Sequence, residues 1–78
     1  MKQIQNIQGR ITLYKLIWCK IRYWQSLHDV SDADLAECLA VGERTLRNYD
    51  KNAKEIILEK LDNFLMTNRL ELHELLSM

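Results

Sequence analysis

The chain has no proline, two glycines and two cysteines among its 78 residues. Without proline, long stretches can remain helical, and no alternating apolar and polar pattern indicates a strand. The longest apolar run, residues 16–19, is far shorter than the roughly 20 residues that a membrane-spanning helix needs. The first residues also lack the apolar core of a signal peptide. We therefore expect one small all-α domain that works in the cytoplasm and has no membrane partner.

The residues needed for metal binding or catalysis are also scarce. Cys19 and Cys38 have no Cys-x-x-Cys spacing, and only His28 and His73 could join them. A zinc site needs about four ligands at a recognisable spacing. No glycine-rich phosphate loop, paired-carboxylate pattern or nucleophile with a nearby base is present. We expect two reduced thiols, no metal, no cofactor and no enzymatic activity.

Charge is balanced overall but is divided into blocks along the chain. There are 11 Lys and Arg residues against 11 Asp and Glu residues, so the net charge is zero. Residues 1–28 carry only cations, residues 29–43 only acids, residues 44–54 mostly cations, and residues 55–78 mostly acids. A neutral total argues against binding to nucleic acid, because such binding relies on excess Lys and Arg. The blocks, however, allow folding to place the charges on separate faces.

The first helix is predicted from Arg10 to about Leu27, within a single domain that spans residues 10–78. Residues 1–9 are predicted to be an N-terminal arm or an extra helical turn. Ile11 and Trp18 fall on the far side of this helix, where either another helix of the same chain or a second copy would cover them. The apolar face that should contact the core comprises Leu13, Leu16, Ile17, Ile21, Trp24 and Leu27.

Two short helices are predicted next, with a turn of about three residues between them. Ser31 can cap a helix that begins at Asp32 by accepting from the amide of Asp34. Residues 40–42 separate this helix from a second one over residues 43–51. Because the turn is short, the two helices must cross, which predicts a helix-turn-helix at about 32–50.

The helix over residues 43–51 carries a cluster of hydrogen-bonding side chains. Leu46 and Tyr49 mark its buried side, and the opposite side groups Arg44, Arg47, Asn48 and Lys51. Arginine can donate two hydrogen bonds to guanine, asparagine can pair with adenine, and lysine suits phosphate. This chemistry matches the major groove of DNA, although a solvated helix face is the alternative interpretation.

Residues 31–49 resemble the helix-turn-helix of the phage Cro/repressor-like (lambda-repressor-like) superfamily. The matching residues are Leu35-Ala36, Leu39, Val41, Arg44-Thr45, Leu46 and Tyr49. The resemblance implies a compact five-helix domain that binds double-stranded DNA as a homodimer and regulates transcription, often as a repressor from a phage or mobile element.

If the resemblance holds for function, we expect some residues to contact the bases of the DNA and others to contact its sugar-phosphate backbone. The expected base contacts are Glu43, Arg44, Arg47 and Asn48. The expected backbone contacts are Ser31, Thr45, Lys51, Asn52 and Lys54.

Three residues depart from the pattern of the superfamily. Asp32 stands where glutamine is common and would repel phosphate. Ala40 stands where glycine with a positive φ is common, and alanine there would cost on the order of 1 kcal/mol. Glu43 can accept from cytosine, but it lowers non-specific affinity. Asp32, Glu43 and the zero net charge favour an alternative, in which the fold serves protein contact as an antirepressor, an adaptor or a host-factor binder.

Two closing helices are predicted, over residues 53–66 and 69–77, with one continuous helix as the alternative. Asn52 and Asn68 each precede a glutamate at the spacing of a capping box. The large apolar side chains of this segment exceed what one face needs, so we expect part of them to form a dimer surface, with a wholly intramolecular core as the alternative. They are Ile56, Leu58, Met66, Leu70 and Leu76.

Overall fold

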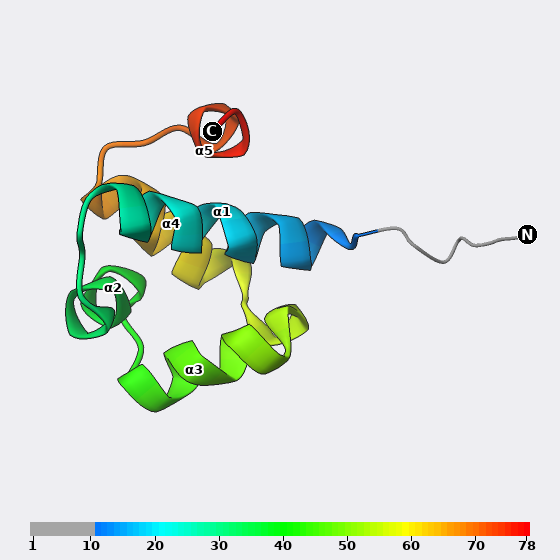
Figure 1. Cartoon of the computed structure of the whole chain (residues 1–78), viewed down its shortest axis with the longest axis vertical. Helices are drawn as coiled ribbons and strands as arrows, with labels where there is room; N and C mark the ends of the chain where they lie inside the picture. Colours follow the sequence, from blue (N-terminus) through cyan, green and yellow to red (C-terminus); the bar gives the residue numbers. More distant parts are fainter. Residues whose placement is uncertain (1–10) are drawn as a thin grey trace, which may run out of the picture.

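The computed structural model describes residues 11–78, which form five α-helices and one short 3-10 helix (Figure 1). No strand occurs in this range, so the all-α prediction is confirmed for it. The predicted arm over residues 1–9 lies outside the described residues. The helices are α1 (Leu13–Leu27), α2 (Asp32–Leu39), α3 (Glu43–Lys51), η1 (Ala53–Glu55), α4 (Leu58–Thr67) and α5 (Leu72–Leu76).

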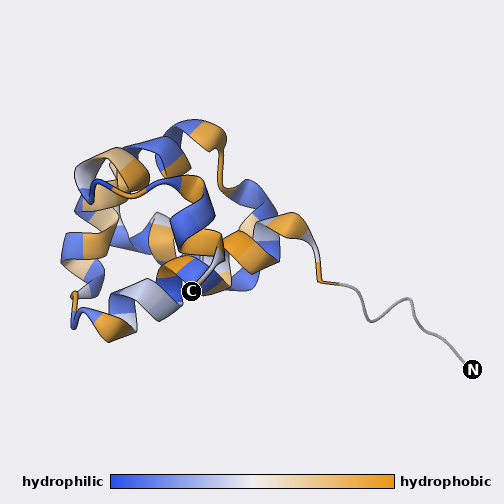
Figure 2. Ribbon diagram, turned by 90° about the horizontal axis from the view of Figure 1, so that it is seen from above, coloured by the Kyte–Doolittle hydropathy of each residue, from blue (hydrophilic) through white to orange (hydrophobic). Residues whose placement is uncertain are grey.

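Helix α1 crosses the middle of the molecule, with α3 on one side and α5 on the other (Figure 1). Each α-helix contributes at least one fully buried aliphatic or aromatic side chain to a common core: Ile21, Leu35, Leu39, Leu46, Phe64 and Leu75. Two edge-to-face aromatic pairs join α1 to its neighbours. The ring centroids of Trp24 and Phe64 lie 5.0 Å apart, and those of Trp18 and Tyr49 lie 5.2 Å apart. Along the ribbon, hydrophobic and hydrophilic residues alternate within each helix, as amphipathic packing requires (Figure 2).

The prediction for the first helix was partly wrong. It begins at Leu13, after Thr12 caps it by accepting from the amide of Lys15, rather than at Arg10. Trp18 is 3% exposed beneath α3, so a helix of the same chain covers it, whereas Leu13 and Leu27 are 62% and 55% exposed. The apolar stripe does not show on which side a neighbouring helix packs. Because α3 lies against one side of α1, the buried arc is shifted toward Trp18.

The helix-turn-helix prediction is confirmed. Helices α2 and α3 begin at Asp32 and Glu43 as expected, and the hydroxyl of Ser31 accepts from the amide of Asp34 at 3.1 Å. Figure 1 shows α2 nearly end-on and α3 from the side, so the two helices cross steeply. Leu35, Leu39 and Leu46 are fully buried at this crossing.

Three helices end at a left-handed residue that is not glycine. Asp29, Ala40 and Arg69 have φ angles of 53°, 60° and 55° after α1, α2 and α4. The amide that follows each one donates back to a carbonyl five residues earlier, as in Val41 to Ala36 at 2.9 Å. This is the Schellman arrangement, which normally uses glycine. The positive φ of Ala40 was expected, whereas those of Asp29 and Arg69 were not.

The C-terminal segment differs from both predicted versions. Residues 53–55 form η1, Ile56 and Ile57 are extended, and α4 begins only at Leu58. Burial of the Ile56 side chain, which is 7% exposed, holds the chain in this extended connection. Asn68 ends α4 by donating to the carbonyl of Phe64, so Asn68 does not begin α5.

Helix α5 begins after Glu71 instead. Glu71 forms a capping box with Glu74, in which the amide of Glu71 donates to the Glu74 side chain at 2.8 Å. The two closing helices are therefore separate, and both begin later than the sequence indicated.

We predict that Ala40→Gly stabilises the fold by about 0.5–1 kcal/mol, because glycine adopts the left-handed conformation without the steric penalty of a Cβ. The free energy of unfolding from urea titration measures this. Ala33→Gly, at an exposed position of the same helix, is the control and should lower stability by up to about 1 kcal/mol. Equal destabilisation by both substitutions would contradict the interpretation.

Candidate nucleic-acid interface

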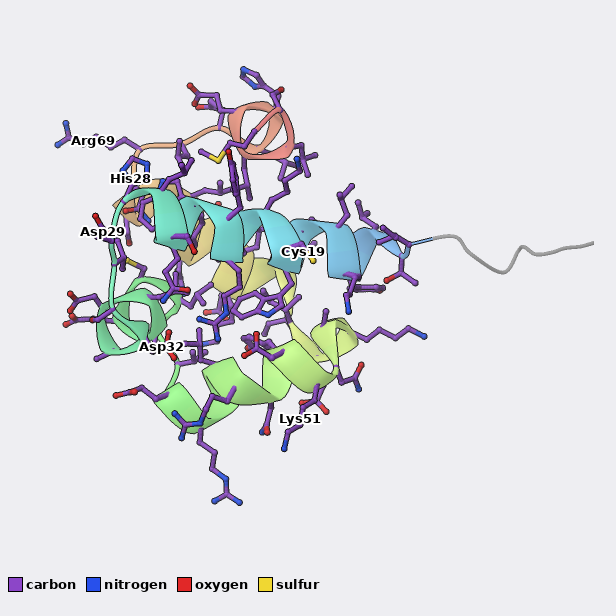
Figure 3. All side chains as sticks on the ribbon, in the orientation of Figure 1. Cys19, His28, Asp29, Asp32, Lys51 and Arg69 are labelled. Atoms are coloured by element: carbon purple, nitrogen blue, oxygen red, sulfur yellow. The ribbon has the colours of Figure 1, made fainter. Side chains whose placement is uncertain are left out.

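Helix α3 presents its polar side away from the rest of the molecule. Leu46 is fully buried and Tyr49 is 4% exposed, and these two anchors set the rotation of the helix. The predicted base-contact residues all lie on the exposed side of α3: Glu43, Arg44, Arg47 and Asn48. Figure 3 shows Lys51 on the outer side of α3, at the lower edge of the view. The structure therefore brings these side chains together on one helix face.

The predicted backbone-contact residues form two groups. Lys51, Asn52 and Lys54 are exposed and follow one another at the C-terminal end of α3 and along η1. Ser31 is exposed at the start of α2, where its hydroxyl caps that helix, and Thr45 is half-buried on the flank of α3. Asn52 also caps η1 by accepting from the amide of Lys54 at 3.3 Å.

Within α3, Glu43 and Arg47 are one helical turn apart, and their Oε1 and Nη1 atoms are 3.9 Å apart. Both side chains are at least half exposed, so this contact is weak and can be exchanged for contacts to a ligand. Arg44, Asn48 and Lys51 are exposed on the same face. The face therefore carries three kinds of hydrogen-bond donor, which are guanidinium, amide and ammonium groups. The carboxylate of Glu43 lies beside them as an acceptor.

Sequence reasoning missed Arg22, which joins α1 to both helices of the helix-turn-helix. Its Nη1 lies 2.8 Å from Asp32 Oδ1, and its Nη2 lies 2.7 Å from Asp50 Oδ2. Trp18 Nε1 donates to Asp50 Oδ1 at 2.7 Å, and Gln25 Nε2 donates to Asp32 Oδ1 at 2.8 Å. We call these five residues the Arg22 cluster. The spacing of Trp18, Arg22 and Gln25 on one side of the first helix was the available signal.

The Arg22 cluster changes the electrostatics expected of Asp32. Hydrogen bonds from Gln25 and then Arg22 lower the pKa of Asp32, and the charge of nearby Arg47 adds to this effect. The hydrogen bonds from Arg22 lower the pKa of Asp50 against the opposing effect of burial, and Trp18 contributes further. Asp32 is therefore ion-paired with Arg22 within the protein, and its side chain stays 43% exposed.

We also searched the part of the chain that the structure describes for a metal site, free thiols and a membrane-spanning helix. No group of three or more His, Cys, Asp or Glu side chains in residues 11–78 is arranged to hold a metal ion. Cys19 is exposed, Cys38 is half-buried, and both are free thiols. None of the described helices is long and apolar enough to cross a membrane.

No protein-family model, curated protein or solved structure matches this chain. Function is therefore inferred from the exposed face of α3 and the contacts that orient it.

We predict that acid weakens the fold through the Arg22 cluster. A carboxyl with a lowered folded pKa adds stability above its unfolded value of about 3.9, and this stability is lost as the pH falls through the folded value. The urea concentration at which half of the protein is unfolded should therefore decrease as the pH is lowered below about 4. Arg22→Gln removes the cation, so its midpoint should fall less over the same range.

The control is Lys15→Gln, which removes an exposed cation from the same helix. It should keep the acid response of the unsubstituted chain. If Arg22→Gln also kept that response in full, Asp32 and Asp50 would not depend on Arg22.

Proposed function

We propose that the chain is a cytoplasmic, sequence-specific DNA-binding regulator that inserts α3 into the major groove and acts as a dimer. The observation that carries the proposal is the exposed face of α3, where four hydrogen-bonding side chains stand opposite the buried anchors Leu46 and Tyr49. An α-helix with its side chains is about 10–12 Å wide, which fits a major groove about 12 Å wide.

Each side chain on this face has a proposed role. Arg44 and Arg47 donate to guanine, Asn48 pairs with adenine, and Glu43 accepts from the amino group of cytosine. Lys51 and Lys54 neutralise phosphates beside the groove. The polar side chains of Ser31, Thr45 and Asn52 contact the sugar-phosphate backbone.

The neutral total charge fits a protein that depends on base contacts more than on phosphate attraction. Non-specific affinity comes largely from neutralised phosphates, so a chain with equal numbers of cations and acids binds random DNA weakly. One copy makes few contacts. Two copies on half-sites one helical turn apart, about 34–36 Å, would supply the affinity that regulation needs.

The alternative function, protein contact through the same fold, is weakened by the Arg22 cluster. Asp32 was one of its supporting features, and the structure pairs that carboxylate with Arg22 at 2.8 Å. The other two features that favour protein contact are Glu43 and the zero net charge of the chain, and both are also compatible with base reading.

We expect the chain to bind a pool of random duplexes at low salt, with affinity falling steeply between about 50 and 200 mM salt because counterions are released from phosphates. Fluorescence anisotropy of labelled duplexes measures this. Replacing Lys51 and Lys54 together by alanine should reduce the slope of log affinity against log salt by about 1.8 for each bound copy, and so by about 3.6 for the proposed dimer. Arg69→Ala, on the side of the molecule away from α3 (Figure 3), is the control and should leave it unchanged. Absence of binding to every duplex at low salt would refute the proposed function and favour protein contact.

Base reading makes a separate prediction. On a preferred duplex, Arg47→Ala or Asn48→Ala should cost about 1–3 kcal/mol of binding free energy and relax the preference at one base pair. Competition with duplexes that carry single base-pair changes measures the preference at each position. Equal losses on all sequences would show that these side chains contact only the backbone.

A further inference from the structure

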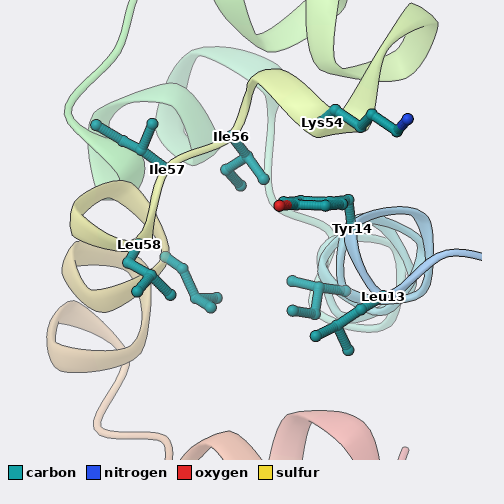
Figure 4. A pocket seen from close by; sticks show the side chains of 8 residues that line it. Leu13, Tyr14, Lys54, Ile56, Ile57 and Leu58 are labelled. Atoms are coloured by element: carbon teal, nitrogen blue, oxygen red, sulfur yellow. The ribbon is translucent and has the colours of Figure 1, made fainter.

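An apolar groove lies beside the helix-turn-helix, between the start of α1 and the start of α4 (Figure 4). Its volume is about 570 Å³. Leu13, Tyr14 and Ile17 form one wall, and residues 56–58 with Leu61 form the other. Lys54, at the rim, is the one charged residue among the eight that line the groove. The lining of the groove therefore matches an apolar occupant.

The side chains around the groove are unusually exposed for their size. Leu58 is 82% exposed, and Leu13, Ile57 and Tyr14 are 62%, 53% and 48% exposed. A second hollow shares Leu58 and Leu61 with the first and continues to Leu72 on α5, which is 42% exposed. Glu59 and Asp62 also line this second hollow. The exposed apolar side chains of the two hollows form one face across α1, α4 and α5, and Leu58 belongs to both hollows.

We propose that this face is the interface with a second copy of the chain, with the copies related by a two-fold axis near Leu58. Taking roughly 200 Å² for a fully exposed large side chain, Leu13, Tyr14, Ile57, Leu58 and Leu72 expose on the order of 600 Å² together. A stable interface buries about 800 Å² per partner. The apolar side chains alone therefore account for most of the area that a dimer needs, and the polar rim supplies the remainder.

The position of the groove suits two copies that read one DNA duplex. The segment from α3 to η1 lies at one end of the groove, and α5 lies at the other (Figure 4). A two-fold axis along this direction sets the copies side by side and keeps both α3 helices on the same side of the dimer. The base-reading side of α3 does not line the groove, so dimerisation leaves it open.

The same observations decide between the two dimer surfaces that the sequence suggested. Trp18 is buried under α3 of its own chain, so it is not available to a second copy; Ile11, which was expected on the same side, precedes α1 and is 64% exposed. Of the surplus apolar residues in the C-terminal segment, Leu58 is exposed at the groove, whereas Met66 is exposed elsewhere on α4. This inference rests on the two-copy arrangement of the proposed function, but it can be tested without DNA.

Sedimentation equilibrium of the full chain without DNA is the test. We expect a dimer at tens of micromolar, and Leu58→Glu should weaken self-association at least tenfold. Met66→Glu adds the same charge to the same helix at a side chain that is 70% exposed outside the groove, and it should associate normally. Circular dichroism should show both variants folded, because neither side chain is buried.

Two results would overturn the inference. One is a monomer up to about 100 μM, which would leave the groove to a different protein. The other is equal weakening of self-association by Leu58→Glu and Met66→Glu. A dimer that depends on Leu58 but binds no duplex would refute only the DNA-binding function. DNA binding by a chain that stays monomeric would refute the dimer interface and the two-copy arrangement, but not base reading by α3.

Discussion

The contact of Arg22 with two carboxylates ties α1 to both helices of the helix-turn-helix and adds to the buried anchors that orient α3, Leu46 and Tyr49. One guanidinium on α1 reaches Asp32 at the start of α2 and Asp50 near the end of α3. Without this cation the two acids would repel each other across the helix-turn-helix. Surface ion pairs are usually weak, but a guanidinium with two hydrogen bonds to one carboxylate and a third to another belongs to the stronger class. Trp18 strengthens the arrangement because its indole donates to Asp50 while its ring packs edge-on against Tyr49.

The same cluster gives the zero net charge of the chain a different meaning. Arg22, Asp32 and Asp50 leave one net negative charge where two acids would otherwise stand near α3. The cations that face solvent from α3 are thus opposed by this remaining negative charge and by Glu43, which lies beside Arg47 and shares its helix face. A local basic face on a neutral chain favours contacts that depend on position over general attraction to phosphate.

Local signals explain why α2 and α3 could be predicted with correct starting points. Ser31 caps α2 through its own hydroxyl, and Ala40 completes the turn with the left-handed φ that the resemblance implied. The buried side of α1, the extended residues before α4 and the Arg22 cluster could not be predicted in this way. Each of them depends on a partner far away in the sequence. Trp18 is buried only because α3 packs on it, and Arg22 lies 28 residues from Asp50. The exposed face of α3 followed from helical periodicity, whereas the ion pair of Asp32 beside it required the tertiary structure.

We propose that α3 reads base sequence in DNA. Selection of duplexes from a random pool by the full chain, followed by sequencing, tests it most directly. We expect enrichment of a two-fold symmetric site with half-sites about one helical turn apart. Its guanine and adenine positions should lose their preference when Arg47 or Asn48 is replaced. A pool that remains random after repeated selection at low salt would contradict it.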